Sequence, residues 1–384
     1  MKASLKFFLL MTMAIFTCLH CKKENDVEPV STKLFTIKGD TILANAGTHF
    51  GRFLTFDGDV LVATQQQLYD AYGKMYFFEH GAHGWVLMDS LKGGLQQIDF
   101  FGNTMAAQMD ITSGENECGS VQLYERLSNG KWQETQLLKM GKHQDGFGDH
   151  IDLKADRLIV GAPAIWWDDL GGDNTDTGSV YIFHKINGQW ELNARLQADD
   201  ASNDDWFGYA VAIEGDYAFV GTSSRQSLYC YRFEEEKWSL FQKLPVGYIN
   251  ALAFEHGKLL VKLSGVWGVT DNVLAYNLQD GQLISVPVEL DFTSFRPTHS
   301  GTQISLKGDQ FILGVWRDGD SHLEACYLLR FQGDSWQLVK KILAPGDYHV
   351  QSNFSEGMGL SDHWMGIGSK PFNGFGAVYL VPIP

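Results

Sequence analysis

Positive charge, cysteine and helix-forming patterns are what this chain of 384 residues has least of. Only 30 Lys and Arg side chains face 46 Asp and Glu, which gives a formal net charge of −16. This excess of carboxylates excludes nucleic acid as a partner, because nothing in the chain could neutralise phosphates. The absence of a basic tract also excludes direct electrostatic binding to an anionic membrane surface, so acidity here mainly indicates solubility.

The cysteines are too few and too scattered to stabilise the fold by disulfide bonds or to bind a metal. Within the main domain Cys118, Cys230 and Cys326 have neither the pairing of a disulfide framework nor the spacing of metal ligands. We expect Cys230 and Cys326 to be small core residues, since each lies in a strand-like segment. Nucleophile-elbow, Walker and dinucleotide signatures are missing too, so the sequence favours a protein without catalysis.

No convincing amphipathic helix appears, and what the chain does contain favours β-structure. It has 41 glycines, only 9 prolines, 13% aromatic residues and 20% charged residues, a composition typical of an all-β protein with many tight turns.

A strand pattern repeats seven times with a period of about fifty residues, which predicts a β-propeller. The turn before the second strand of each copy falls at Gly58, Gly102, Ala155, Gly215, Gly257, Gly308 and Ser361. The fourth strand of six copies begins at Trp85, Trp132, Trp190, Trp238, Leu283 and Trp336. We therefore predict an all-β fold of seven blades, each a four-stranded antiparallel sheet, over residues 33–384.

The seventh copy lacks a fourth strand, because its third strand over residues 378–383 is followed only by Pro384. We expect the N-terminal strand at residues 33–38 to close this last blade, since such closure removes the free edges of the ring.

The first twenty residues read as a leader. Lys2 and Lys6 precede an apolar run over residues 7–16, which is too short to span a bilayer and fits a secretory signal peptide. Residues 21–32 read as a flexible charged tether.

Two cysteines near the end of the leader resemble the lipidation site of a bacterial, Bacteroidetes-type lipoprotein. Ile15 and Thr17 suit Cys18, whereas the polar boundary favours Cys21, and a plain secreted protein remains the alternative. The resemblance implies export to the cell envelope, as an outer-membrane lipoprotein on its periplasmic or surface side, with membrane contact only through the lipid.

One copy carries a family signature. Phe147-Gly148 opens its first strand, Gly161-Ala162-Pro163 follows the second, and residues 178–183 read Gly-Ser-Val-Tyr-Ile-Phe. This copy resembles FG-GAP repeats, which form seven-bladed propellers such as the head of integrin α subunits. Phe207-Gly208 and Phe50-Gly51 fit the same motif, whereas Phe101-Gly102 falls at a second-strand turn and only looks like it.

The resemblance implies calcium in acidic loops, but the required spacing is absent. The nearest candidates are Asp168, Asp169, Asp173 and Asp176, with a second acidic segment over residues 199–205. We expect solvated acidic turns there and no cofactor, with calcium binding at the first four as the alternative.

Unusual side chains gather in loops that strand alternation places on one face of the propeller. They are Trp166, Trp167, Asp168, Asp169, Trp206 and Trp316. Aromatic rings beside carboxylates suit stacking on a sugar ring or anchoring a protein partner. The alternative is a loop folded down over its own blade. We expect a binding or scaffolding module that recognises a protein or a glycan through this face.

A second reading makes the protein a surface glycan hydrolase or lyase. His143, Asp145, Asp149 and His150 cluster around Phe147-Gly148, where a carboxylate and an imidazole could form an acid–base pair at the channel mouth. The alternative is that these side chains cap the turn and line the mouth.

Overall fold

The structure of the protein is a computed structural model. It describes residues 35–38, 41–44, 49–65, 73–93, 97–109, 119–140, 145–163, 177–200, 205–222, 226–263, 272–291, 304–315, 325–343, 354, 357–369 and 376–384.

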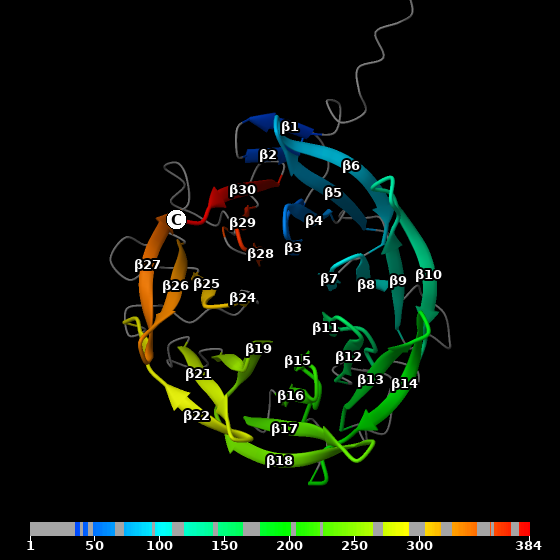
Figure 1. Ribbon diagram of the computed structural model, residues 1–384, viewed down its shortest axis with the longest axis vertical. Coiled ribbons are helices and arrows are strands. Elements are labelled where there is room, and N and C mark those ends of the chain that lie inside the picture. Colours follow the sequence, from blue (N-terminus) through cyan, green and yellow to red (C-terminus); the bar gives the residue numbers. More distant parts are fainter. Residues whose placement is uncertain are drawn as a thin grey trace, which may run out of the picture.

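Seven antiparallel sheets, built from the described residues, stand in a ring around a central axis (Figure 1). Blade 1 contains β3 (Leu54–Asp57), β4 (Val60–Gln65), β5 (Lys74–Gly81) and β6 (Gly84–Lys92), and blade 2 contains β7 (Ile98–Phe101), β8 (Thr104–Met109), β9 (Ser120–Arg126) and β10 (Trp132–Leu138). Blade 3 contains β11 (His150–Lys154), β12 (Arg157–Ala162), β13 (Ser179–Ile186) and β14 (Gln189–Leu196), and blade 4 contains β15 (Ala210–Glu214), β16 (Tyr217–Gly221), β17 (Ser227–Glu234) and β18 (Lys237–Pro245). The predicted seven-bladed propeller is confirmed.

The remaining blades follow the same plan, and blades 6 and 7 have an additional strand at their outer edges. Blade 5 contains β19 (Ile249–Glu255), β20 (Lys258–Leu263), β21 (Asn272–Gln279) and β22 (Gln282–Val286). Blade 6 contains β24 (Ile304–Lys307), β25 (Gln310–Val315), β26 (Ala325–Gln332) and β27 (Ser335–Leu343), with β23 (Val288–Glu289) added in parallel to β27. Blade 7 contains β28 (Met358–Leu360), β29 (Trp364–Ser369) and β30 (Ala377–Pro382).

The N-terminal segment closes blade 7, but by a different strand from the one the sequence indicates. It is β2 (Thr41–Ala44) that pairs with β30, and β1 (Phe35–Lys38) folds back on β2 as a fifth, outermost strand. The prediction that residues 33–38 pair with the third strand of the last blade was therefore wrong, because the next strand, β2, takes that position. The strand pattern of residues 33–38 does not show that they form a hairpin with β2 and so lie one strand further out.

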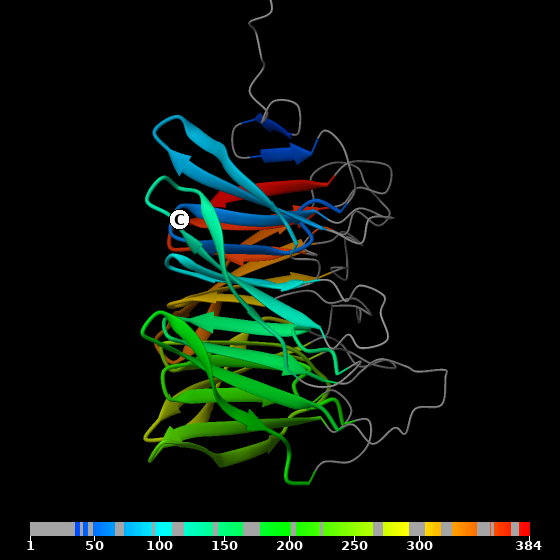
Figure 2. The ribbon, with the colours of Figure 1, turned by 90° about the vertical axis from the view of Figure 1, so that its right-hand side faces the viewer.

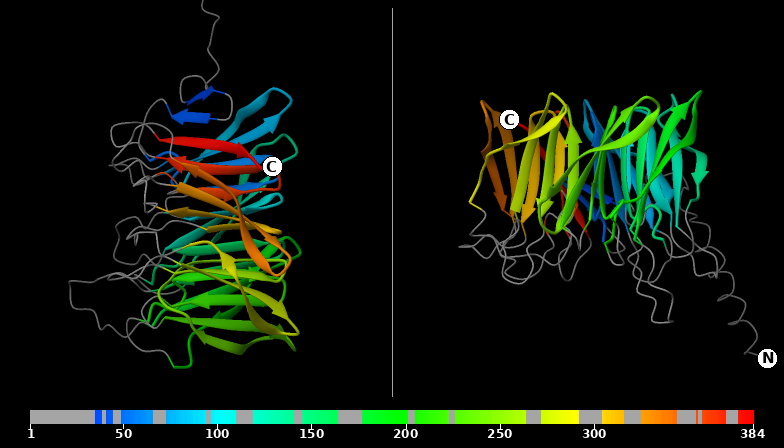
Figure 3. Two further views of the ribbon diagram at one scale, coloured as in Figure 1. Left: turned by 90° about the vertical axis from the view of Figure 1, so that its left-hand side faces the viewer. Right: turned by 90° about the horizontal axis from the view of Figure 1, so that it is seen from below.

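The two faces of the ring differ in which turns they carry. Figure 2 shows the strands of all blades running between the same two faces, and in Figure 3 the hairpins joining third and fourth strands lie together on one of them. We call the opposite face, at which the innermost strands β11 and β15 begin, the entry face.

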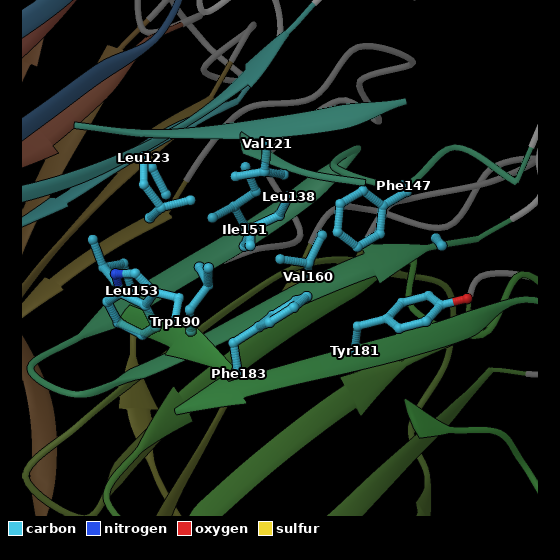
Figure 4. Close-up of a cluster of buried hydrophobic side chains, with 13 residues drawn as sticks. Val121, Leu123, Leu138, Phe147, Ile151, Leu153, Val160, Tyr181, Phe183 and Trp190 are labelled. Atoms are coloured by element: carbon cyan, nitrogen blue, oxygen red, sulfur yellow. The ribbon is translucent and has the colours of Figure 1, made fainter. Parts of the chain in front are cut away.

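The core lies between neighbouring blades. Every residue of β12 is buried, whereas β14 at the outer edge buries only Trp190. Figure 4 shows the packing between blades 2 and 3, where Leu123 and Leu138 of blade 2 lie near Leu153 and Val160 of blade 3. Each sheet is therefore apolar on both faces in its middle strands, as expected for stacked blades.

A β-bulge recurs in the outer strands, just after the tryptophan that opens the fourth strand of a blade. In blades 1, 2, 3, 4 and 6 the register shifts at the third residue after it, leaving as bulged residues Met88, Thr135, Asn193, Phe241 and Val339. In blades 1, 2 and 4 the next residue, which is Asp89, Gln136 or Gln242, then bonds to the following blade, because a bulge re-aims the side chains beyond it. Gln136 exchanges two hydrogen bonds of 2.8 and 2.9 Å with the backbone of Trp190, and Asp89 accepts one of 3.1 Å from the Trp132 amide.

The Phe-Gly motif locks one blade onto the preceding one. Phe147 is fully buried and packs edge-on against Tyr181 and Phe183 of its own blade, with ring centroids 5.3 and 6.3 Å away. Gly148 has a φ of 103° and lies against blade 2, where a Cβ would come within 3.2 Å of Gln108 and Val121. Phe101 instead is exposed at the β7–β8 turn, so its assignment as a false motif is confirmed.

Candidate functional site

A central channel with a volume of about 470 Å³ is lined by residues from the innermost strand of every blade. Each of these strands pairs on one side only, with the second strand of its blade, so its other edge faces the channel. Unpaired backbone groups at such an edge need partners.

Carboxylates supply those partners from blade to blade. Asp57 accepts a hydrogen bond of 2.6 Å from the amide of Gly102, and Glu214 accepts one of 2.6 Å from His256. In the same way Asp99 accepts from the amide of Leu153. Much of the acidic side-chain content of the channel is therefore structural, because it satisfies the inner edges of the blades.

Asp152 and Lys154 lie next to each other in the channel lining. Asp152 accepts from the amide of Ile213, and its carboxylate lies 3.8 Å from the Lys154 ammonium. Burial and the neighbouring Asp99 raise the pKa of Asp152, although Lys154 opposes this shift. Burial alone would lower the pKa of Lys154, but Asp152, Asp99, Glu255 and Glu214 raise it overall, so this lysine is charged.

Two copies of one turn present side chains to the channel at the entry face. The turns read Asp145-Gly146-Phe147-Gly148-Asp149 and Asp205-Trp206-Phe207-Gly208-Tyr209. In both, the last residue donates its amide to the second, from Asp149 to Gly146 and from Tyr209 to Trp206, at 3.0 Å. The shared geometry places Asp149 and Tyr209 in the channel wall, whereas Asp145 and Asp205 are buried outside the channel lining.

The carboxyl group of Asp149 is held in a poorly solvated position. Its Oδ1 accepts a hydrogen bond of 2.8 Å from Gln108 Nε2, and burial raises its pKa to about 7. The adjacent His150 is half-buried, and its desolvation lowers its pKa to about 4. Near neutral pH the channel wall therefore carries the neutral imidazole of His150 beside the partly protonated carboxyl of Asp149.

Three aromatic rings from blades 3 and 4, which we call the aromatic rim, lie next to Asp149. The Tyr209 ring is 5.1 Å from the His150 ring and 6.1 Å from the Trp206 ring, the latter pair inclined by only 28°. All three side chains are half-buried, and His150 and Tyr209 line the channel. The rim combines flat apolar surfaces with polar tips, which suits a ligand with apolar and polar sides.

Of the binding residues predicted from sequence, the structure describes Trp206 alone. Lying outside the described residues are Trp166, Trp167, Asp168, Asp169, Asp173, Asp176 and Trp316, together with His143, Cys18 and Cys21. Their roles stay predictions. Next to the first turn residues of blade 4, Gly178 of blade 3 forms a parallel bridge with Phe207.

The acidic segment that begins at Asp199 is partly engaged in protein contacts. Asp200 accepts hydrogen bonds of 2.6 Å from Lys243 and 2.9 Å from Tyr229, which lower its pKa to about 2. Among the residues that the structure describes, no group of three or more His, Cys, Asp or Glu side chains is placed to hold a metal ion. The calcium alternative concerns acidic residues outside that part.

Sequence reasoning missed Tyr209 and Gln108. Tyr209 could have been found, because it occupies the motif position that Asp149 occupies one copy earlier. Gln108 could not, because it comes from blade 2 and meets Asp149 only across the blade interface. Of the four residues predicted to cluster at the channel mouth, Asp149 and His150 line the channel, Asp145 is buried outside its lining and His143 lies outside the described residues.

Comparison with known proteins supports the repeat and the fold. The FG-GAP repeat family matches residues 140–183 and 190–227, which include both turns that reach the channel. No curated protein sequence matches the chain. Within the described residues, no helix has the length and apolar character needed to cross a bilayer.

Solved structures with very different sequences share the architecture. A chain of the Mitotic Checkpoint Complex superposes with a TM-score of 0.54 at 10% identity, covering 91% of this chain and 97% of that one. The WD40 domain of Toxoplasma gondii coronin gives 0.53 at 8%, covering 90% and 84%. A Lactobacillus plantarum protein gives 0.52 at 14%, covering 79% and 89%. At these identities the likeness concerns the fold alone.

Proposed function

We propose that this protein is an envelope-anchored binding or scaffolding module that recognises a protein or a glycan through its entry face. The observation that carries the proposal is the aromatic rim of His150, Trp206 and Tyr209 beside a channel of about 470 Å³. Half-buried aromatic side chains next to a concave, polar wall are typical of recognition sites. A propeller with FG-GAP repeats is compatible with this role.

The anchoring part of the proposal rests on the leader. The apolar run and the two cysteines support export and lipidation at Cys18 or Cys21. Such an anchor would hold the propeller at the outer membrane by a short tether, with the lipid as the sole membrane contact. Mass spectrometry of the mature N-terminus, with Cys18→Ser and Cys21→Ser as separate variants, identifies the modified residue.

The binding face is tested through the tryptophans predicted to project from it. We expect Trp166→Ala combined with Trp167→Ala to lower capture of the natural partner from the cell's own envelope at least tenfold, with the melting temperature unchanged. Truncation of aromatic anchors removes a large share of binding energy. The control is Val86→Ala with Met88→Ala, two exposed residues on the outer strand β6. Equal capture by both double variants would contradict the assignment.

A glycan hydrolase or lyase is the second candidate, favoured by the protonation states at the channel mouth. An Asp149 carboxyl with a pKa of about 7 and a neutral His150 can donate and accept protons near neutral pH. Product release from a panel of polysaccharides, abolished in both His143→Ala and Asp149→Asn, would establish catalysis. Absence of product across that panel, together with binding, supports the module.

A further inference from the structure

Trp206 has a left-handed backbone conformation, which the turn requires at this position but which is unfavourable for a bulky residue. The residue before the Phe-Gly pair has a positive φ in three blades: 59° at His49, 70° at Gly146 and 54° at Trp206. Blade 3 fills this position with glycine, for which the left-handed region costs little. Blade 4 fills it with tryptophan, for which that conformation is strained.

The turn itself does not require the side chain of Trp206, which leaves the indole available for a role other than folding. Gly146 shows that the same turn, with the same 3.0 Å amide-to-carbonyl bond, forms without any side chain there. What the indole adds is a face nearly parallel to Tyr209, beside the channel wall. Strained residues of this kind concentrate at ligand-binding positions.

The channel wall around the ring also offers groups that bind hydroxyls. Asp149 is fixed by Gln108, and uncharged amide and hydroxyl side chains also line the channel: Thr55, Gln97, Asn250 and Ser305. Amides, hydroxyls and a partly protonated carboxyl both donate and accept hydrogen bonds, as sugar hydroxyls do. The cavity volume lies in the range of small-ligand sites.

The charged side chains of the channel wall indicate which charge the ligand can carry. The carboxylates in the channel lining are Asp57, Asp99, Asp149, Asp152 and Glu255, and the bases are Arg52, Lys154 and Lys307. Burial raises the pKa of Asp149 and of Asp152, so negative groups outnumber positive ones in this lining only as these two carboxyls ionise. An acidic sugar would then be repelled, whereas an uncharged one would not.

We propose that the entry face binds a neutral pyranose unit of a glycan, whose apolar ring face packs on Trp206 and Tyr209 while its hydroxyls bond to Asp149 and His150. This inference rests on the proposed function and specifies the ligand of its recognition site.

The test uses the full-length protein and methyl glycosides of neutral hexoses, N-acetylhexosamines and hexuronic acids, with tryptophan fluorescence and calorimetry as readouts. We expect at least one neutral glycoside to bind and the hexuronic acids to bind at least tenfold more weakly. Trp206→Gly should reduce binding of the neutral glycoside at least tenfold without lowering the melting temperature, because glycine fits the left-handed turn.

The matched control is His49→Gly, which relieves the same backbone strain in blade 1 and should leave glycoside binding unchanged. Equal loss in both variants, or a preference for hexuronic acids, would overturn the neutral-pyranose site.

A second arm separates this inference from the proposed function. If the natural partner is captured through the entry face but neutral glycosides neither bind nor compete, the partner is recognised as a protein and the sugar site is refuted. If capture is also insensitive to Trp166→Ala with Trp167→Ala and to Trp206→Gly, the proposed function itself is refuted.

Discussion

At the scale of single residues, the same turn serves two purposes in neighbouring blades. Asp149 and Tyr209 occupy equivalent positions, yet one brings a carboxyl and the other a phenol to the channel. The backbone geometry is fixed by the motif, so the final position is free to vary in chemistry. This freedom explains how a structural repeat can carry a site without losing its fold.

The titration of Asp149 predicts a specific pH dependence of stability. Its folded pKa of about 7 exceeds the ordinary value of 3.8, so the folded state binds more protons between those values and this group's contribution to stability falls as pH rises. His150, with a folded pKa of about 4 against 6.5, contributes the opposite slope over most of that window. Each slope reaches ~1.4 kcal/mol per pH unit.

Asp149→Asn removes the pH dependence of stability that comes from Asp149 and keeps the one that comes from His150. The fold should survive, since the amide oxygen of asparagine can still accept the hydrogen bond from Gln108. We expect the stability of this variant relative to wild type to increase as pH rises from 4.5 to 6.5. Urea unfolding at a series of pH values measures the difference, and parallel profiles for the two proteins would contradict a raised Asp149 pKa.

At the scale of elements, contacts between blades depend on glycines at the ends of strands. Gly161 near the end of β12 and Gly178 just before β13 lie against the backbone of blade 4, where a Cβ would collide with Gly208 and Phe207. Backbone thus packs on backbone near the entry face, which brings the two motif turns close enough for their aromatic rings to meet. The glycines of the family signature are therefore residues of the interface between blades.

A matched pair of glycines separates packing from backbone strain. Gly178 and Gly188 both have a φ of 83°, but a Cβ at Gly178 would meet Phe207, whereas at Gly188 it would meet open space. We expect Gly188→Ala to cost about 1 kcal/mol of unfolding free energy and Gly178→Ala a further ~1–3 kcal/mol. Chemical denaturation of both variants checks this, and equal losses would show that the interface yields.

At the scale of the whole molecule, the ring is closed by joining distant parts of the chain. The pairing of β2 with β30 brings residues 41–43 next to residues 377–379, so the last blade gains the outer strand that it lacks. Closure also brings Gly51 of blade 1 against Gly368 and Val378 of blade 7.

Removal of the closing hairpin should therefore weaken the ring. We expect deletion of residues 1–44 to lower the melting temperature by more than ten degrees and to promote self-association, because it exposes the edge of β30. Deletion of residues 1–34, which keeps β1 and β2, should do neither. Thermal unfolding and size-exclusion chromatography compare the two proteins, and equal behaviour would show that closure is dispensable.

Much of the fold was predictable because its signals are local. The spacing of turns at Gly58 and its equivalents, and the tryptophans that open the outer strands, repeat along the chain and need no knowledge of distant contacts. The candidate site was predictable only in part. Asp149 and His150 follow a visible motif, but the roles of Gln108 and Tyr209 depend on which blades are neighbours.

The number of blades, the strand pattern within each and the tryptophans that open the outer strands could be read from the sequence alone, since alternation and turn residues are properties of short segments. The tertiary structure alone decided which N-terminal strand closes the ring, which side chains line the channel and how Asp149 and His150 titrate. The physical reason is that burial, and with it the pKa of a side chain, depends on the neighbours that ring closure supplies from other blades.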